Sequence, residues 1–135
     1  NDLINDVFTD LTDSYRAPYH NQSTFYYDRL SASAIKIFDH VAKYSTFYTI
    51  VIHDDALPGF LNKIGELLKD LSISDHIKDF DDPVIDHELM ASYQSYAILG
   101  LIVEWVKGGF KYTPSYMATQ LLYILAKESP IKPKT

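Results

Sequence analysis

Apolar residues recur at the spacing of a helix along most of the chain, which predicts an all-α domain of five or six helices. The first helical face is formed by Leu3, Ile4, Val7, Phe8 and Leu11. A polar, tyrosine-rich stretch over residues 13–27 predicts a loop, and a second amphipathic helix is predicted over residues 30–43. Residues 46–52, TFYTIVI, have the composition of a strand, but no second strand-like run can pair with them, so we predict a short buried helix.

The second half of the chain predicts longer helices. A leucine-rich stripe over residues 60–71 predicts one of them, and a nearly all-apolar run over residues 86–108 predicts the longest. Thr113 followed by Pro114 fits an N-cap and a first helical position, so a last helix is expected from there to about residue 127. We therefore expect one helical domain over residues 1–128 and a loose tail over residues 129–135.

Composition narrows the possible functions. The 135 residues, 47% hydrophobic and 22% charged, suit one globular domain, and no apolar run approaches the roughly 20 residues of a membrane span. Because the net charge is −6 and the basic residues are scattered, the chain by itself is not expected to bind nucleic acid. It has neither a signal-like start nor a cysteine, which favours a cytoplasmic location.

The long helix is apolar on every side, which a surface helix would not be. Helices of one small domain cover about two of its three apolar sectors, so the third predicts an interface with another chain. Together with the broad stripe on the last helix, it predicts a homodimer closed by a four-helix bundle. The expected interface residues are Leu101, Trp105, Met117, Leu121 and Ile124. Burial of both stripes inside a single chain is the alternative.

Aromatic residues suggest a ligand pocket. Eleven tyrosines are many for a small helical core, because a buried tyrosine hydroxyl needs a partner. Gly100 leaves room beside the long helix, which predicts a small-molecule pocket with apolar walls and a few polar groups. The residues expected to line it are Phe47, Tyr48, Phe60, Ile64, Tyr93, Tyr96 and Gly100. The same residues are equally compatible with rings that pack on one another, with Gly100 permitting close helix contact.

The sequence contains no motif of a nucleophilic, phosphate-binding or metal-dependent enzyme, so no catalytic activity, cofactor or metal ligand is expected. The five histidines are His20, His40, His53, His76 and His87. Several of them neighbour an aspartate, but the Glu-x-x-His spacing of helical metal sites is missing, which favours solvated histidines. A small helical metalloprotein or hydrolase that uses these His and Asp residues is an alternative.

Two stretches resemble a known family. Residues 96–122, YAILGLIVEWVKGGFKYTPSYMATQLL, combine a mid-helix Gly, a Trp near the helix end, a glycine stop and a Thr-Pro helix start. Residues 45–68, STFYTIVIHDDALPGFLNKIGELL, place an aromatic pair and a turn before a leucine-rich helix. Both stretches resemble the C-terminal regulatory domain of TetR/AcrR-type transcriptional repressors, most closely the group that includes regulators of dihydroxyacetone kinase operons. The resemblance covers residues 45–125.

The resemblance implies a homodimer whose last two helices form the bundle, an interior that receives an unknown small effector, and DNA binding through an N-terminal helix-turn-helix domain. No such basic domain precedes Leu3, so DNA binding is expected only of a longer parent protein. The predicted function is the effector-binding and dimerisation domain of a TetR-like repressor. A helical protein-interaction module without a small-molecule ligand is the first alternative.

Overall fold

The structure is a computed structural model that describes residues 2–16, 26–54, 57–75 and 82–128, and within these residues it contains six α-helices and no strand. The helices are α1 (Asp2–Arg16), α2 (Tyr26–Lys43), α3 (Ser45–Asp54), α4 (Phe60–Asp75), α5 (His87–Lys107) and α6 (Pro114–Glu128). The predicted all-α class is thus confirmed, including the short helix predicted over residues 46–52 despite their strand-like composition. The predicted loose tail, 129–135, lies outside the described residues.

The first helix is longer than its apolar pattern indicates. The polar stretch predicts a loop from residue 13, but α1 continues to Arg16. Tyr15, in this extra turn, is buried, and its hydroxyl lies 2.9 Å from the Ser72 hydroxyl of α4. Ser33 of α2 donates a hydrogen bond to the Tyr15 carbonyl oxygen at 2.9 Å. Tertiary hydrogen bonds therefore hold a turn whose sequence is polar.

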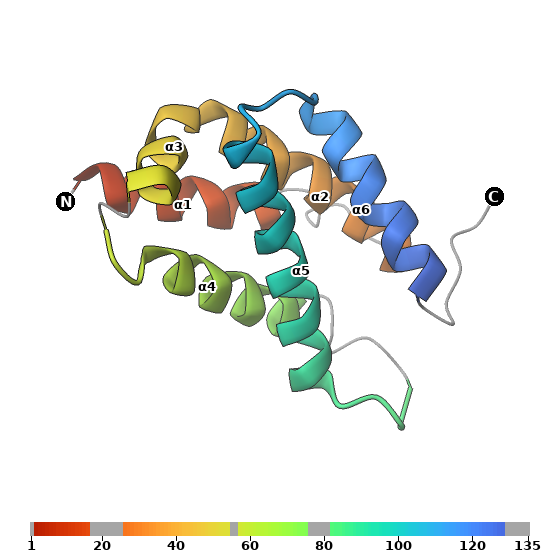
Figure 1. Cartoon of the computed structure of the whole chain (residues 1–135). Helices are drawn as coiled ribbons and strands as arrows, with labels where there is room; N and C mark the ends of the chain where they lie inside the picture. The colour runs from red at the N-terminus through yellow and green to blue at the C-terminus, as the bar shows by residue number, and fades with distance from the viewer. Residues whose placement is uncertain (1, 17–25, 55–56, 76–81, 129–135) are drawn as a thin grey trace.

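The two C-terminal helices pack on different neighbours. α5 packs mainly against α4 and α3, whereas α6 lies along α2 (Figure 1). The first helix, α1, contacts both α2 and α4 and so joins the two groups. Direct contact between α5 and α6 is slight by comparison. This arrangement leaves the surface between α5 and α6 open to other molecules.

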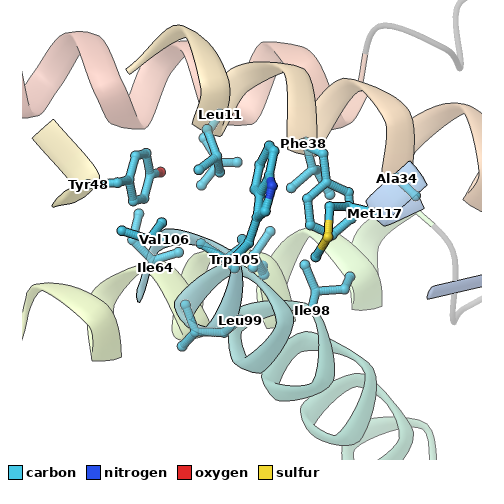
Figure 2. Close-up of a cluster of buried hydrophobic side chains, with 14 of the residues drawn as sticks. Leu11, Ala34, Phe38, Tyr48, Ile64, Ile98, Leu99, Trp105, Val106 and Met117 are labelled. Atoms are coloured by element: carbon cyan, nitrogen blue, oxygen red, sulfur yellow. The ribbon is translucent and has the colours of Figure 1, made fainter. Parts of the chain in front are cut away.

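Trp105 joins several helices in the core. Its indole ring meets the ring of Phe38 edge-on, with centroids 5.6 Å apart, and Figure 2 shows it rising from α5 beside Met117. The indole Nε1 donates a hydrogen bond to the carbonyl oxygen of Tyr112 at 2.9 Å. One side chain thus connects α5, α2 and the segment before α6.

Local signals set the ends of the last two helices. The Asp86 carboxylate accepts a hydrogen bond from the first turn of α5 at 3.0 Å, as an N-cap does. After α5, Gly109 and Phe110 adopt the left-handed backbone conformation, with φ of 77° and 58°. Thr113 then accepts a bond from the first turn of α6 at 3.1 Å. The predicted Thr-Pro start of the last helix is confirmed.

The composition of α5 reflects its two environments. Among the described helices it is long and apolar enough to cross a membrane by length and composition alone. Of its apolar 18-residue stretch, 44% is buried inside the chain, including Ile98 and Ile102. A core helix passes the same test of composition. Other apolar residues of α5, such as Leu89, Tyr93 and Tyr96, are exposed.

Candidate functional site

A groove of about 360 Å³ opens between α5 and α6. Its lining includes Leu101 and Trp105 from α5, Met117 and Ile124 from α6, and the pair Tyr112 and Tyr116. The two tyrosine rings are stacked with centroids 4.6 Å apart, and both side chains are exposed. Glu104, Lys111 and Gln120 add polar groups to the edge. The groove is therefore an apolar surface with a polar rim, as a protein interface requires.

The predicted dimer residues differ in how much of each is available to a partner. Ile124 is 43% exposed and Leu101 is half-buried, so both offer apolar atoms to the groove. Trp105 and Met117 line the groove although each is mostly buried. Leu121 is 2% exposed and belongs to the core of the single chain, since α6 turns its buried side toward α2. The prediction is corrected for Leu121, and the available edge of α6 is the side that carries Ile124.

Four of the predicted pocket residues lie together at the junction of α3 and α4. The rings of Phe47 and Phe60 meet edge-on with centroids 5.1 Å apart. Tyr48 and Ile64 are fully buried. The packing of these side chains on one another follows the second interpretation of the aromatic residues, in which rings fill the core.

The other three predicted pocket residues lie elsewhere. Tyr93 and Tyr96 of α5 are 53% and 44% exposed. Gly100, in the same helix, is exposed as well. A Cβ atom built on Gly100 would meet no atom within 4 Å. The room beside Gly100 is thus real, but it opens to solvent and not toward Phe47. The seven residues do not surround one cavity, because Tyr93 and Gly100 are exposed and the half-exposed Tyr96 ring lies against Gly65 of α4.

A second hollow, of about 580 Å³, lies between α1 and α4. Its lining residues are Phe8, Thr9, Thr12 and Asp13 from α1, and Asn62, Lys63, Glu66, Leu67 and Asp70 from α4. The Phe8 ring contacts the Phe60 ring with centroids 5.4 Å apart, which joins the hollow to the aromatic cluster at α3 and α4. The lining holds three carboxylates, those of Asp13, Glu66 and Asp70, and one ammonium group, that of Lys63. The local charge therefore favours a neutral or cationic ligand over an anion.

A buried hydrogen-bonded chain ties the first three helices together. His40 of α2 has a fully buried side chain, with Nδ1 2.7 Å from the Asp10 carboxylate of α1. Its Nε2 lies 2.8 Å from the Tyr48 hydroxyl of α3. Lys43 donates to the other Asp10 oxygen at 3.1 Å. Because a carboxylate only accepts, Nδ1 carries the proton and Nε2 accepts from Tyr48.

The pKa shifts of this chain agree with that assignment. Burial lowers the pKa of His40 below 6.5 and outweighs the opposing hydrogen bond with Asp10. For Asp10, burial acts to raise the pKa, but the hydrogen bonds from His40 and Lys43 prevail and hold it below 3.8. Burial also raises the pKa of Tyr48 far above its usual range. A neutral imidazole thus lies between an ionised carboxylate and a protonated phenol.

Sequence reasoning missed this chain and the α1/α4 hollow. In the sequence, His40 directly follows Asp39. The carboxylate that contacts its ring, however, belongs to Asp10, 30 residues earlier. The burial of His40 could have been predicted from the sequence, because His40 lies on the same apolar face of α2 as Ile37 and Val41. No comparable signal marks the hollow, which depends on how α1 and α4 are spaced.

The arrangement offers binding surfaces more than reactive groups. Across the described ranges, no group of three His, Cys, Asp or Glu side chains is placed to hold a metal ion. His40 and Tyr48 satisfy each other inside the core, so their bond holds helices together. The fold and its surface define a helical domain with an apolar groove between its last helices and an acidic hollow near its first.

Comparison with known protein families identifies the class. Residues 28–127 match the TetR-type family described as "Transcriptional regulator C-terminal region". This match spans well over half of the 135 residues, so the chain belongs to that family. A search of curated proteins and a search of solved structures found no match. The predicted TetR-type relationship is confirmed at the level of the family, and it makes the chain a transcription-regulator domain.

Proposed function

We propose that this domain is the sensor and dimerisation unit of a TetR-like repressor, which pairs with a second copy and responds to a small effector. The observation that carries the proposal is the family match over residues 28–127. DNA binding is assigned to a helix-turn-helix domain of a longer protein, and the domain itself has no catalytic role. A regulator of transcription is expected in the cytoplasm.

The open groove between α5 and α6 supports the dimer. Tyr116 and Ile124 are each more than 40% exposed there, which leaves apolar surface in contact with water. Two helices from each of two chains bury such surface in a four-helix bundle. Contact between identical chains is self-complementary when a two-fold axis relates them.

The hollow between α1 and α4 supports the effector site. Its volume of about 580 Å³ suits a small molecule, and its lining includes the apolar side chains of Phe8 and Leu67. Glu66 and Asp70 provide negative charge at the edge. We therefore propose a neutral or cationic effector that places an apolar part against Phe8.

Signalling would follow from the position of α1, since this helix forms one wall of the hollow. A ligand that fits one spacing of α1 and α4 better than another shifts the population toward that spacing. The size of the response is limited by the difference between the ligand's binding free energies for the two spacings, typically about 1–3 kcal/mol. Because the sequence resembles regulators of dihydroxyacetone kinase operons, we also propose that the parent protein regulates genes of that kind.

A thermal-shift screen tests the effector proposal. Cationic, neutral and anionic compounds of similar size, with dihydroxyacetone included, are each added to the purified domain. We expect neutral or cationic compounds to raise the melting temperature, because a ligand at 100 times its Kd stabilises the native state by about 2.7 kcal/mol. The double variant Glu66→Gln and Asp70→Asn should lose the response to cations, whereas Asp39→Asn, on the exposed face of α2, should keep it.

An unchanged melting temperature across all three classes would remove the effector from the proposal and leave the dimer as the role of the domain. Loss of the cation response in Asp39→Asn as well as in the double variant would mean that the ligand senses overall charge. In that case the hollow between α1 and α4 is not its site.

A further inference from the structure

The buried imidazole of His40 connects two other helices, and histidine is the side chain that changes charge closest to neutral pH. On one side, Nδ1 lies 2.7 Å from the Asp10 carboxylate of α1. On the other side, Nε2 lies 2.8 Å from the Tyr48 hydroxyl of α3. The protonation state of this one ring therefore affects how both α1 and α3 are held.

The two hydrogen bonds of the ring respond in opposite ways to an added proton. Nδ1 already donates to Asp10, and a positive charge on the ring strengthens a bond to a carboxylate. At Nε2 the added proton occupies the lone pair that accepts from Tyr48. Protonation thus strengthens the contact with α1 and removes the acceptor of the Tyr48 hydroxyl.

Tyr48 has no second acceptor to turn to. Its side chain is fully buried, and within the described residues its hydroxyl has His40 as its one hydrogen-bond partner. If the hydroxyl turned to accept from the new Nε2–H, its own hydrogen would point into the core without an acceptor. A buried donor without an acceptor is unfavourable, so the protonated ring favours a position of Tyr48 in which the hydroxyl reaches water.

We propose that His40 is a pH switch for α3, which holds Tyr48 while the ring is neutral and releases Tyr48, but keeps Asp10, when the ring is protonated. Under this switch α1 stays on α2 while α3 loosens. The switch needs neither a ligand nor a second copy, so its failure would leave the proposed function to its own tests.

The charged and titratable groups around His40 come from α1, α2 and α3. Besides Asp10 and Tyr48, these are Lys43, which donates to Asp10 at 3.1 Å, and Tyr44, whose ring centroid lies 5.2 Å from that of His40. In the described part of α5 and α6, the buried side chains on the sides that meet α2 carry no titratable group: Trp105, Met117, Ala118 and Leu121. The balance on His40 is therefore set mainly by its burial, Asp10 and Lys43.

That balance determines the pH range of the switch. Burial lowers the pKa of His40 below 6.5 and outweighs the attraction of Asp10 for the proton. The ring is thus neutral at neutral pH, and α3 is held. Because the position that holds Tyr48 binds a proton less readily than the released one, acid shifts the population toward release.

Loosening of α3 would reach the α1/α4 hollow through a row of aromatic rings. Tyr48 is followed by Phe47, which meets Phe60 edge-on with ring centroids 5.1 Å apart. Phe60 in turn contacts Phe8 at 5.4 Å, and Phe8 lines the hollow. The switch therefore gives pH a path to the wall of the hollow.

NMR titration of the His40 ring tests the two hydrogen bonds separately. Tyr48→Phe should move the titration midpoint of His40 to higher pH, because the neutral ring loses a donor that the charged ring has no lone pair to accept. Asp10→Asn should move it to lower pH, because the charged ring loses its carboxylate. The midpoint of His53, exposed on the same helix as Tyr48, should stay unchanged in both variants. A His40 midpoint that is the same in wild type and Tyr48→Phe would refute the switch.

Spin-label distances then test which helix moves, and the natural chain has no cysteine that would compete for the label. Labels at Lys36→Cys and Ile50→Cys, both exposed, report on α2 and α3. Labels at Lys36→Cys and Asn5→Cys, also exposed, report on α2 and α1. Excess unlabelled protein limits the signal to distances within one chain. Below the His40 midpoint, the distance distribution between α2 and α3 should broaden reversibly, while that between α2 and α1 stays narrow and the helix content by circular dichroism is retained.

His40→Gln is the matched variant for this measurement. Its amide accepts from Tyr48 and donates to Asp10 as the neutral ring does, but it gains no proton. The distribution between α2 and α3 should therefore stay narrow at both pH values. Broadening in His40→Gln would assign the movement to another group. An unchanged wild-type distribution, or equal broadening of both label pairs, would also overturn the switch, since the first means no movement and the second means general unfolding.

Discussion

His40 differs from the other histidines that the structure describes, since His53 is exposed and His87 is only partly buried. Both of its ring nitrogens are used, one by Asp10 and one by Tyr48. Protonation would add a second N–H where Tyr48 already donates, and it would place a charge in the core. The histidine is therefore suited to the neutral state, and its burial links the stability of the fold to pH.

Acid should destabilise the domain through His40. Because burial lowers the pKa of His40 in the folded state, the unfolded chain binds more protons, and stability rises with pH. The free energy of unfolding should thus fall as the pH drops below 6.5 and level off below the folded-state pKa. Denaturant titrations between about pH 8 and about pH 5 measure this slope. Asp10, whose pKa is lowered from 3.8, adds its own loss as the pH falls toward and below that value, mostly under the range measured.

Two leucine variants isolate the residue responsible. His40→Leu should remove the slope and cost about 1–3 kcal/mol at neutral pH, because the Tyr48 hydroxyl loses its buried acceptor. His53→Leu, at an exposed position, should keep the slope and change stability by less than about 0.5 kcal/mol. A slope that survives in His40→Leu would assign the pH dependence to another group.

The turn between α5 and α6 sets where the last helix can lie. Gly109 and Phe110 reverse the chain in left-handed conformations, and the Phe110 ring packs edge-on against Trp105 with centroids 4.9 Å apart. Thr113 then caps α6. With these constraints α6 runs along α2 and leaves a groove beside α5. The surface that we assign to the dimer thus depends on a few residues of one short connection.

Removing the cap should weaken α6 measurably. Thr113→Ala deletes the acceptor of the Tyr116 N–H and should lower the free energy of unfolding by about 1 kcal/mol. Thr119→Ala is the matched control, since Thr119 is exposed inside the same helix and alanine favours helix more than threonine. We expect Thr119→Ala to raise stability by a few tenths of a kcal/mol, measured by urea denaturation. Equal effects in the two variants would show that the cap contributes nothing.

Helices were easier to predict from the sequence than the places where they meet. Apolar stripes and runs located five of them, the lack of a second strand-like run left residues 46–52 as a helix, and the Thr113–Pro114 pair marked the start of α6 correctly. All of these signals are read from the sequence alone. The direction in which a helix face points is decided by its neighbours. Gly100 was expected to face a pocket and faces solvent, while Leu121 was expected at an interface and lies in the core. Tyrosine occurs in both settings, so its abundance did not show which rings are buried.

The whole chain consists of two helix groups joined by α1 and by the core around Trp105. One group contains α3, α4 and α5, and the other contains α2 and α6. The α5/α6 groove lies between the two groups and exposes apolar surface. The acidic hollow lies between α1 and α4. Under our proposal, a ligand in the hollow and a second copy at the groove would both contact helices that pack on α2 or α4. The helices of the core would then connect the two proposed sites.

Lysine substitutions at two positions of α6 separate the groove from the core. Ile124→Lys changes an exposed side chain, so the chain should stay folded and sediment at 15.5 kDa where the wild type is expected at twice that mass. Leu121→Lys should unfold the chain, because it buries an unpaired charge in the core. Ile50→Lys, with 45% exposure on α3, is the control that should remain dimeric. Melting temperatures should rise with protein concentration for wild type and Ile50→Lys but not for Ile124→Lys, since only a dimer is stabilised by mass action. Wild-type association by Ile124→Lys would exclude the α5/α6 groove as the interface.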